Sequence, residues 1–234
     1  MGTTGVQGTM LHCFHHAGGD RRAFRHWARL EPHVRVVAYD DDASGPEPIV
    51  ATARRWWRGV PDPSGVYYGH SMGALVAYEA AAAAESLGGV GPRAVVLGAP
   101  PGRHARRCLD RAGGRPTDRL TRDLARVRRY VPSRAALRVP VHVVRGTLDD
   151  VVGEADALEW TARGGPGSRH HRLPGAGHLF HHVPDDMLTD LVRAVAATPT
   201  GPDALVGPDA SDGPDALAGL DALVTDRGSA GAVA

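Results

Sequence analysis

The sequence contains no lysine, so arginine supplies every basic side chain apart from histidine. The chain also has 30 glycines and 18 prolines in 234 residues. Because the composition is biased in this way, a cluster of arginines is weaker evidence for a functional surface. Charge of one sign is not in excess, because the formal net charge is +1. A protein whose main partner is nucleic acid needs a clear basic excess. The composition therefore argues against a nucleic-acid partner.

Cysteine and long apolar runs are scarce as well. Cys13 and Cys108 are the only cysteines and lack the spacing of a metal or redox pair, which favours a reducing, intracellular setting over a disulfide scaffold. No apolar run approaches the roughly 18–20 residues that a membrane span needs. Residues 1–7 have no basic or apolar region typical of a secretory signal. We therefore expect a cytoplasmic protein without a membrane segment.

Short apolar segments alternate with helix-like segments along most of the chain. The expected strands are Met10–Phe14, Val34–Tyr39, Val66–Tyr68, Ala94–Leu97, Val139–Val144 and Ser168–Leu173. The expected helices are Arg21–Leu30, Ile49–Trp57, Gly73–Glu85, Glu154–Ala162 and Asp185–Ala197. This alternation predicts an α/β fold with a mainly parallel sheet of about six or seven strands, flanked by helices.

Two segments interrupt the alternation. Residues 101–137 form a long insertion with one strong helical stretch at Arg119–Tyr130, which predicts a short helical lid. Residues 199–234 are a low-complexity Gly/Pro/Asp/Ala tail, a composition that favours disorder. We therefore expect one domain at residues 1–198, followed by the tail.

The pentapeptide Gly69-His70-Ser71-Met72-Gly73 lies between an expected strand and an expected helix. This strand–turn–helix context is that of the nucleophile elbow of α/β-hydrolases, in which a serine sits on a strained turn between small residues. The start of the helix also directs its positive end towards the serine. We therefore predict an α/β-hydrolase fold with Ser71 as the nucleophile.

A serine nucleophile needs a histidine base and an acid that orients it. In this fold the chain order is serine, acid, histidine. Asp149 ends the segment Arg145-Gly-Thr-Leu-Asp149, where a carboxylate is expected at the carboxyl edge of the sheet, and Asp150 is the alternative acid. His178 follows the last expected strand among small residues, and we predict that it is the base.

The tetrahedral intermediate of such a reaction needs two backbone N–H donors. Met72, directly after the nucleophile, is expected to supply one. The loop after the first strand is expected to supply the other, from Ala17 or, as second choice, His16.

The other histidines gather near the first strand and around His178. They include His12, His15, His16, His170, His171, His181 and His182. Clustered imidazoles can ligate zinc, but no His-Glu-x-x-His motif or cysteine pair accompanies them. We expect no metal site, and we expect His181 and His182 to face solvent at the start of the last helix.

Several motifs resemble one family in particular. The segment Leu11-His-Cys-Phe-His-His-Ala-Gly-Gly19 resembles the Phe-Pro-x-Ala-Gly-Gly segment of type II thioesterases, the stand-alone editing hydrolases of polyketide and nonribosomal peptide assembly lines. The elbow is similar to that of the family, including Met72 after the serine. The Gly146–Asp149 turn, Trp160 and the Gly-x-Gly-His-x-Phe segment that ends at Phe180 follow in the same order. The resemblance covers roughly residues 10–196.

The resemblance implies hydrolysis of acyl or peptidyl thioesters from the phosphopantetheine arm of an acyl or peptidyl carrier protein, with no cofactor or metal. Alternatives are a pathway-specific cyclase or acyltransferase, a general serine carboxylesterase, and a non-hydrolytic scaffold. The sequence departs from the family at His15 (usually Pro), at residues 40–45 (usually Pro-Gly-Arg-Gly), and in a shorter lid. A shorter lid predicts a more open acyl pocket.

The lid is rich in arginine. Between Arg103 and Tyr130 there are ten arginines and three aspartates, a formal charge of +7. This charge has two equally favoured interpretations. The arginines could dock an acidic carrier protein, or they could form a solvated helix face in an arginine-biased chain. If docking is correct, we expect Arg122, Arg126 and Arg129 to contribute.

Overall fold

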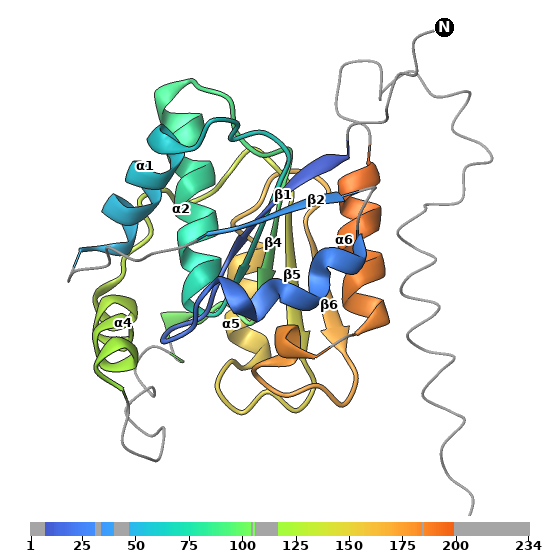
Figure 1. Cartoon of the computed structure of the whole chain (residues 1–234). Coiled ribbons are helices and arrows are strands. Elements are labelled where there is room, and N and C mark those ends of the chain that lie inside the picture. Colours follow the sequence, from blue (N-terminus) through green and yellow to red (C-terminus); the bar gives the residue numbers. More distant parts are fainter. Residues whose placement is uncertain are drawn as a thin grey trace, which may run out of the picture.

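A six-stranded parallel sheet forms the centre of the molecule (Figure 1). The computed structural model describes residues 8–30, 34–39, 47–103, 105, 117–183 and 185–198. In sheet order the strands are β2 (Val34–Ala38), β1 (Thr9–Phe14), β3 (Val66–His70), β4 (Ala94–Gly98), β5 (Val141–Gly146) and β6 (Arg169–Leu173). Each neighbouring pair is parallel. The predicted α/β fold with a parallel sheet is therefore confirmed, with six strands in these ranges.

The helices lie on both faces of the sheet (Figure 1). They are η1 (Arg21–Leu30), α1 (Ile49–Gly59), α2 (Met72–Leu87), α4 (Asp118–Arg129), α5 (Glu154–Thr161), η3 (Phe180–His182) and α6 (Asp186–Ala197). Side chains of α1, α2, α4 and α5 pack in one buried cluster with Tyr67 of β3. Side chains of η1 and α6 pack in a second cluster with Tyr68. Adjacent strand residues thus enter opposite clusters, as the pleat requires, and two-sided burial explains why the strands are almost continuously apolar.

Helix α2 runs through the first of these clusters. Its residues from Met72 to Ala84 are all buried, which its many alanines allow because small side chains let the helix pack closely on the sheet and on α1. The helix ends at Gly88, whose φ of 66° is left-handed and is easily adopted by glycine. This long buried helix provides a rigid support for the turn that precedes it.

Most elements differ from their predicted bounds by one or more residues, and two of the differences have a clear physical reason. Residues Arg21–Leu30 form a 3-10 helix, and its buried residues Phe24, Trp27 and Leu30 recur every three positions, as a helix with three residues per turn requires. Strand β5 begins at Val141 instead of Val139, because Pro140 has no N–H with which to extend the ladder.

Helix α4, which the sequence analysis assigned to a lid, is anchored to the rest of the fold. Its first turn is capped by Thr117, whose side chain accepts a hydrogen bond of 3.2 Å from the Leu120 N–H. Beyond its last turn, the Tyr130 hydroxyl donates a hydrogen bond of 2.7 Å to Glu79, a buried carboxylate of α2. The lid is therefore fixed to the helix that follows Ser71.

Several sequence predictions concern residues outside the described ranges. They are Cys108, the segment 40–45, residues 106–116 of the lid and the tail from 199 to 234. Of the helices in the described ranges, none is long and apolar enough to span a membrane.

Candidate active site

Ser71 occupies a strained turn between β3 and α2. Its φ of 53° and ψ of −115° are unusual for a residue with a side chain, and such a conformation costs about 1–3 kcal/mol. The turn needs small neighbours, because a Cβ at Gly69 would lie 2.1 Å from the Gly73 oxygen. A Cβ at Gly73 would lie 2.1 Å from the Phe14 oxygen of β1. The pentapeptide therefore has the geometry of a nucleophile elbow.

A chain of hydrogen bonds connects Ser71 to a buried carboxylate. The Ser71 hydroxyl lies 3.1 Å from His178 Nε2, and His178 Nδ1 lies 3.0 Å from Asp149 Oδ2. One tautomer satisfies both contacts, in which Nδ1–H donates to Asp149 and Nε2 accepts from the serine. The three residues come from the carboxyl ends of β3, β5 and β6 and their following loops.

The Asp149 carboxylate is held by more than His178. Its Oδ1 accepts hydrogen bonds of 2.9 Å from the Val151 and Val152 N–H groups, and its side chain is fully buried. Burial raises the pKa of Asp149, but the hydrogen bond and charge of His178 and the two backbone donors together lower it below its ordinary value. The carboxylate is therefore ionised at neutral pH and can stabilise a protonated His178. The neighbouring Asp150 is exposed.

The loops that carry Asp149 and His178 are joined directly. Thr147 N–H donates to the Leu173 oxygen and Leu148 N–H donates to the Ala176 oxygen, both at 2.9 Å. A Cβ at Gly146 would lie 2.2 Å from that same Ala176 oxygen, so the close approach requires glycine. The structure thus brings Ser71, His178 and Asp149 together as the sequence motifs suggested.

The two residues predicted as oxyanion donors belong to the elbow and to the loop after β1. Met72 is the first residue of α2 and is buried. Ala17 lies in the loop after β1, whose first part is adjacent to the elbow because the Phe14 and His15 oxygens face Gly73. Gly19 N–H donates 3.0 Å to the His16 oxygen, which fixes this loop. The donor roles of Met72 and Ala17 stay predictions.

His70 has a structural position that sequence analysis did not identify. Its Nε2–H donates 2.7 Å to the His178 oxygen, and its Nδ1 accepts 3.2 Å from the Tyr68 hydroxyl. Burial lowers the pKa of His70 well below its ordinary value, so the ring is neutral. His70 therefore holds the backbone of the base residue. Its place inside the pentapeptide, next to the serine, was the available signal.

The prediction that His181 faces solvent is wrong. The residue is 0% exposed, because its ring stacks on that of His70 with 3.6 Å between centroids. It lies in η3, before α6, and its ring also contacts that of Phe24 at 5.8 Å between centroids. His182 is exposed, as expected.

The lid contributes a buried ion pair that sequence analysis also missed. Asp123 and Arg126 of α4 approach within 3.2 Å, and each side chain is 3% exposed. Arg126 also donates 2.8 Å to the Glu47 oxygen and 2.6 Å to the Thr52 hydroxyl. The interpretation of Arg126 as a docking residue is therefore wrong, because its charge is used inside the protein. Arg122 and Arg129 are exposed.

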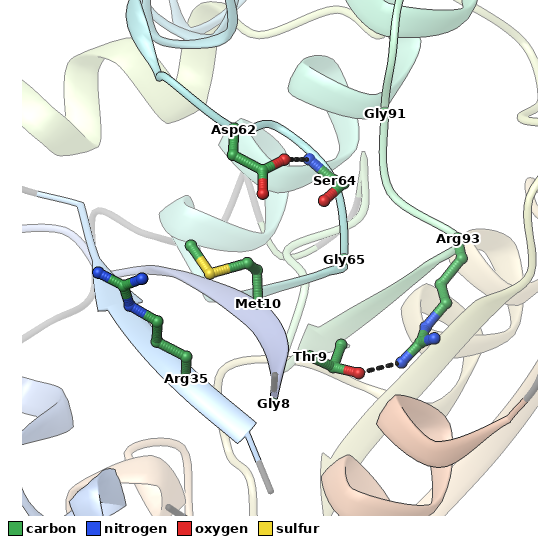
Figure 2. A pocket seen from close by; sticks show the side chains of 9 residues that line it. All are labelled: Gly8, Thr9, Met10, Arg35, Asp62, Ser64, Gly65, Gly91 and Arg93. Carbon is green, nitrogen blue, oxygen red and sulfur yellow. Dashed lines mark hydrogen bonds between the residues drawn. The ribbon is translucent and has the colours of Figure 1, made fainter. Parts of the chain in front are cut away.

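A cavity of about 490 Å³ lies near the amino-terminal ends of the strands (Figure 2). Figure 2 shows Arg35 and Arg93 on its two sides, with Arg93 donating 2.7 Å to the Thr9 hydroxyl at the start of β1. Ser71 and His178 lie beyond the carboxyl ends of the parallel strands, so this cavity is remote from them. It is not part of the candidate active site.

Comparison with known families agrees with this geometry. A family model for the thioesterase domain matches residues 9–193, which include Ser71, Asp149 and His178. The chain belongs to the thioesterase domain family. It is therefore a hydrolase of the α/β-hydrolase type. A search of curated protein sequences gives no significant match.

Solved thioesterases share the fold of this family member. The RedJ thioesterase from the prodiginine biosynthetic pathway of Streptomyces coelicolor is 24% identical, with a TM-score of 0.66 over 80% of this chain and 90% of RedJ. The type II thioesterase BorB from the borrelidin biosynthetic cluster is 23% identical, with a TM-score of 0.63 over 83% and 93%. The NocB thioesterase domain, solved as a covalent complex with a fluorophosphonate nocardicin G analogue, is 23% identical, with a TM-score of 0.55 over 81% and 95%.

Proposed function

We propose that this thioesterase hydrolyses acyl or peptidyl thioesters from the phosphopantetheine arm of a carrier protein in polyketide or nonribosomal peptide biosynthesis. The observation that carries the proposal is the hydrogen-bond chain from Ser71 through His178 to Asp149. The RedJ and BorB proteins, which share the fold, come from natural-product pathways. The cytoplasmic setting expected from the sequence belongs to the same proposal.

The first half of the proposed reaction acylates the serine. His178 Nε2 takes the Ser71 proton as Oγ attacks the thioester carbon, and the Asp149 carboxylate stabilises the resulting imidazolium. The carbonyl oxygen becomes an oxyanion, which accepts hydrogen bonds from the backbone N–H groups of Met72 and Ala17. When the C–S bond breaks, His178 returns its proton to the leaving thiolate, and the acyl group stays on Ser71 as an ester.

The second half releases the acid. His178 takes a proton from water, whose oxygen attacks the ester carbon of acyl-Ser71. The tetrahedral intermediate uses the same two backbone donors, and collapse returns the proton from His178 to Ser71 Oγ. The products are a free carboxylic acid and a regenerated serine. In this scheme no group outside the chain, the substrate and water takes part.

The test is a panel of acyl and aminoacyl carrier proteins offered to the full chain and to its Ser71→Ala variant, with products identified by mass spectrometry. We expect free acid and free carrier thiol with the wild-type chain only. Matched oxygen esters are measured in parallel. Faster hydrolysis of the oxygen esters would favour a carboxylesterase, cyclic products would favour a cyclase, and equal turnover by Ser71→Ala would contradict the proposal.

A further inference from the structure

Three histidines from two separate loops meet beside the candidate active site. His16 belongs to the loop after β1, whereas His181 and His182 belong to η3. Each ring offers one nitrogen, and the three nitrogens lie within 4.8 Å of one another. The rings of His16 and His182 have centroids 4.6 Å apart, and those of His181 and His182 are 4.3 Å apart. No other group of three or more potential ligands is present among the described residues.

The spacing of the first two rings fits a tetrahedral metal ion. Zinc–imidazole bonds of about 2.0–2.1 Å at a tetrahedral angle place two ligand nitrogens roughly 3.3–3.4 Å apart. His16 Nδ1 and His181 Nε2 are 3.1 Å apart. Without an ion, one of these nitrogens must carry the shared hydrogen. With an ion, that proton moves to the other nitrogen of its ring, and both lone pairs face the metal.

The third ring is able to complete the set. His182 is exposed, so its side chain can rotate and bring its nitrogen the remaining distance at little packing cost. His181, in contrast, is held rigidly by its stacking on His70 and is fully buried. A buried ligand held by stacking and an exposed ligand together form a site that an ion can enter from solvent.

We propose that His16, His181 and His182 bind one divalent transition-metal ion, with Zn²⁺ as the expected species. A donor set made only of imidazoles suits Zn²⁺, Co²⁺, Ni²⁺ and Cu²⁺ and disfavours Mg²⁺ and Ca²⁺, which prefer oxygen. A cavity of about 420 Å³, lined by His16 and His182 together with Asp20 and His26, leads to the cluster and leaves room for a water ligand. The sequence shows two groups of histidines but not that they meet, because His16 and His181 are 165 positions apart.

The proposed ion joins two loops that surround Ser71. His16 precedes Ala17, the expected oxyanion donor, and His181 follows the base His178 by three positions. His70 contacts both sides, because it stacks on His181 and hydrogen-bonds to the His178 backbone. An ion that binds only the folded chain stabilises it. The ion therefore cross-links the two loops and takes no part in the reaction proposed above.

The test measures metal uptake by the full chain, produced without a histidine tag and treated with a chelator. Zn²⁺ is titrated by calorimetry, and Co²⁺ by its visible absorption, which is intense for tetrahedral coordination. We expect one ion per chain, tetrahedral Co²⁺ bands and a higher melting temperature with Zn²⁺. In His182→Ala, whose side chain is exposed, we expect affinity to fall at least tenfold without loss of folding. His16→Ala should show the same loss.

His26→Ala is the matched control, because His26 lines the same cavity but is outside the cluster. We expect it to bind Zn²⁺ as the wild-type chain does. His171→Ala is a second control, since His142 and His171 lie 3.3 Å apart but belong to no group of three potential metal ligands among the described residues. Absence of stoichiometric uptake would overturn the proposal. So would unchanged affinity in His182→Ala, or a loss confined to His171→Ala.

Discussion

The Gly18 N–H, in the loop after β1, donates a hydrogen bond of 2.8 Å to the Asp123 carboxylate of the lid helix α4. Asp123 is also the partner of the buried Arg126. The residue beside Ala17 is thus held by a side chain 105 positions away. Through this contact the lid fixes the backbone path of the loop that we expect to supply an oxyanion donor.

Replacing Asp123 tests this coupling. In Asp123→Ala, Arg126 stays buried without its carboxylate, and removing one partner of a buried pair costs about 3–5 kcal/mol of unfolding free energy. The double variant Asp123→Ala/Arg126→Met removes the unpaired charge and should regain much of that stability. Because the Gly18 contact is still absent, we expect its kcat to stay roughly 10–100-fold below wild type.

The control for this experiment is Asp118→Ala, a change on the exposed first turn of the same helix. Its unfolding free energy should fall by no more than about 1 kcal/mol, from the lost charge at the helix N-terminus. Denaturant unfolding and steady-state kinetics measure both effects. Wild-type kcat in the double variant would show that Asp123 does not position the loop.

Exposed arginines of the lid provide a test of carrier docking. Arg122→Glu/Arg129→Glu reverses two exposed charges of α4 and leaves the buried Arg126 intact. If the lid steers an acidic carrier, KM for carrier-bound substrate should rise about tenfold at low salt, whereas KM for a small acyl thioester should not change. Arg54→Glu/Arg58→Glu makes the same charge change on α1 and should have neither effect. An equal rise for both substrates in the lid variant would refute docking.

The acid of the triad is tested by a pair of neighbouring substitutions. Asp149→Asn keeps the size of the side chain but removes the charge that stabilises protonated His178, so kcat should fall roughly 10³–10⁴-fold. Asp150→Asn changes an exposed residue and should retain kcat within about twofold. Thioester hydrolysis by the two purified variants is the measurement. The reverse pattern would assign the acid to Asp150.

Stability at acid pH should depend on His142. Burial, and then the nearby His171 and Arg169, lower the pKa of His142 from 6.5 to about 4. Between these values the unfolded chain binds a proton that the folded chain does not. The stability from the neutral ring is therefore fully present above pH 6.5 and declines as pH falls towards 4, by at most about 1.4 kcal/mol per pH unit.

The variant His142→Gln removes this titration. Unfolding free energies measured by urea at several pH values should show a smaller decline below pH 6.5 in the variant than in the wild-type chain. If the unfolding free energies of the two proteins declined with pH in parallel, His142 would have the same pKa in the folded and the unfolded chain, and the prediction would be wrong.

The sheet could be predicted from sequence because its causes are local. Strands buried on both faces must be apolar throughout. The strand that begins at Val66 can therefore be recognised from its own residues, without knowledge of the strands beside it. The 3-10 character of η1 was not predicted, although the spacing of Phe24, Trp27 and Leu30 carried that information. At this spacing, a helix with three residues per turn and one with 3.6 are hard to tell apart from sequence.

The only part of the candidate site that could be predicted was the set of residues whose order along the chain is characteristic of the fold. Ser71, Asp149 and His178 each lie beyond the end of a strand, and their order along the chain follows the fold. The contacts of Asp123 with Gly18 and of His16 with His181 join residues more than 100 positions apart. Such contacts depend on how the lid and η3 fold back over the sheet, which no local pattern encodes. For the same reason, the sequence did not distinguish the buried Arg126 from the exposed arginines of the same helix.

In the proposed function, a carrier-bound thioester acylates Ser71. The most direct measurement is rapid quenching of the full chain with an acyl carrier protein, followed by mass spectrometry of its peptides. We predict an acyl adduct on the peptide that contains Ser71, appearing before free acid and absent from Ser71→Ala. Release of acid at the wild-type rate by Ser71→Ala, or an adduct on another residue, would contradict the account.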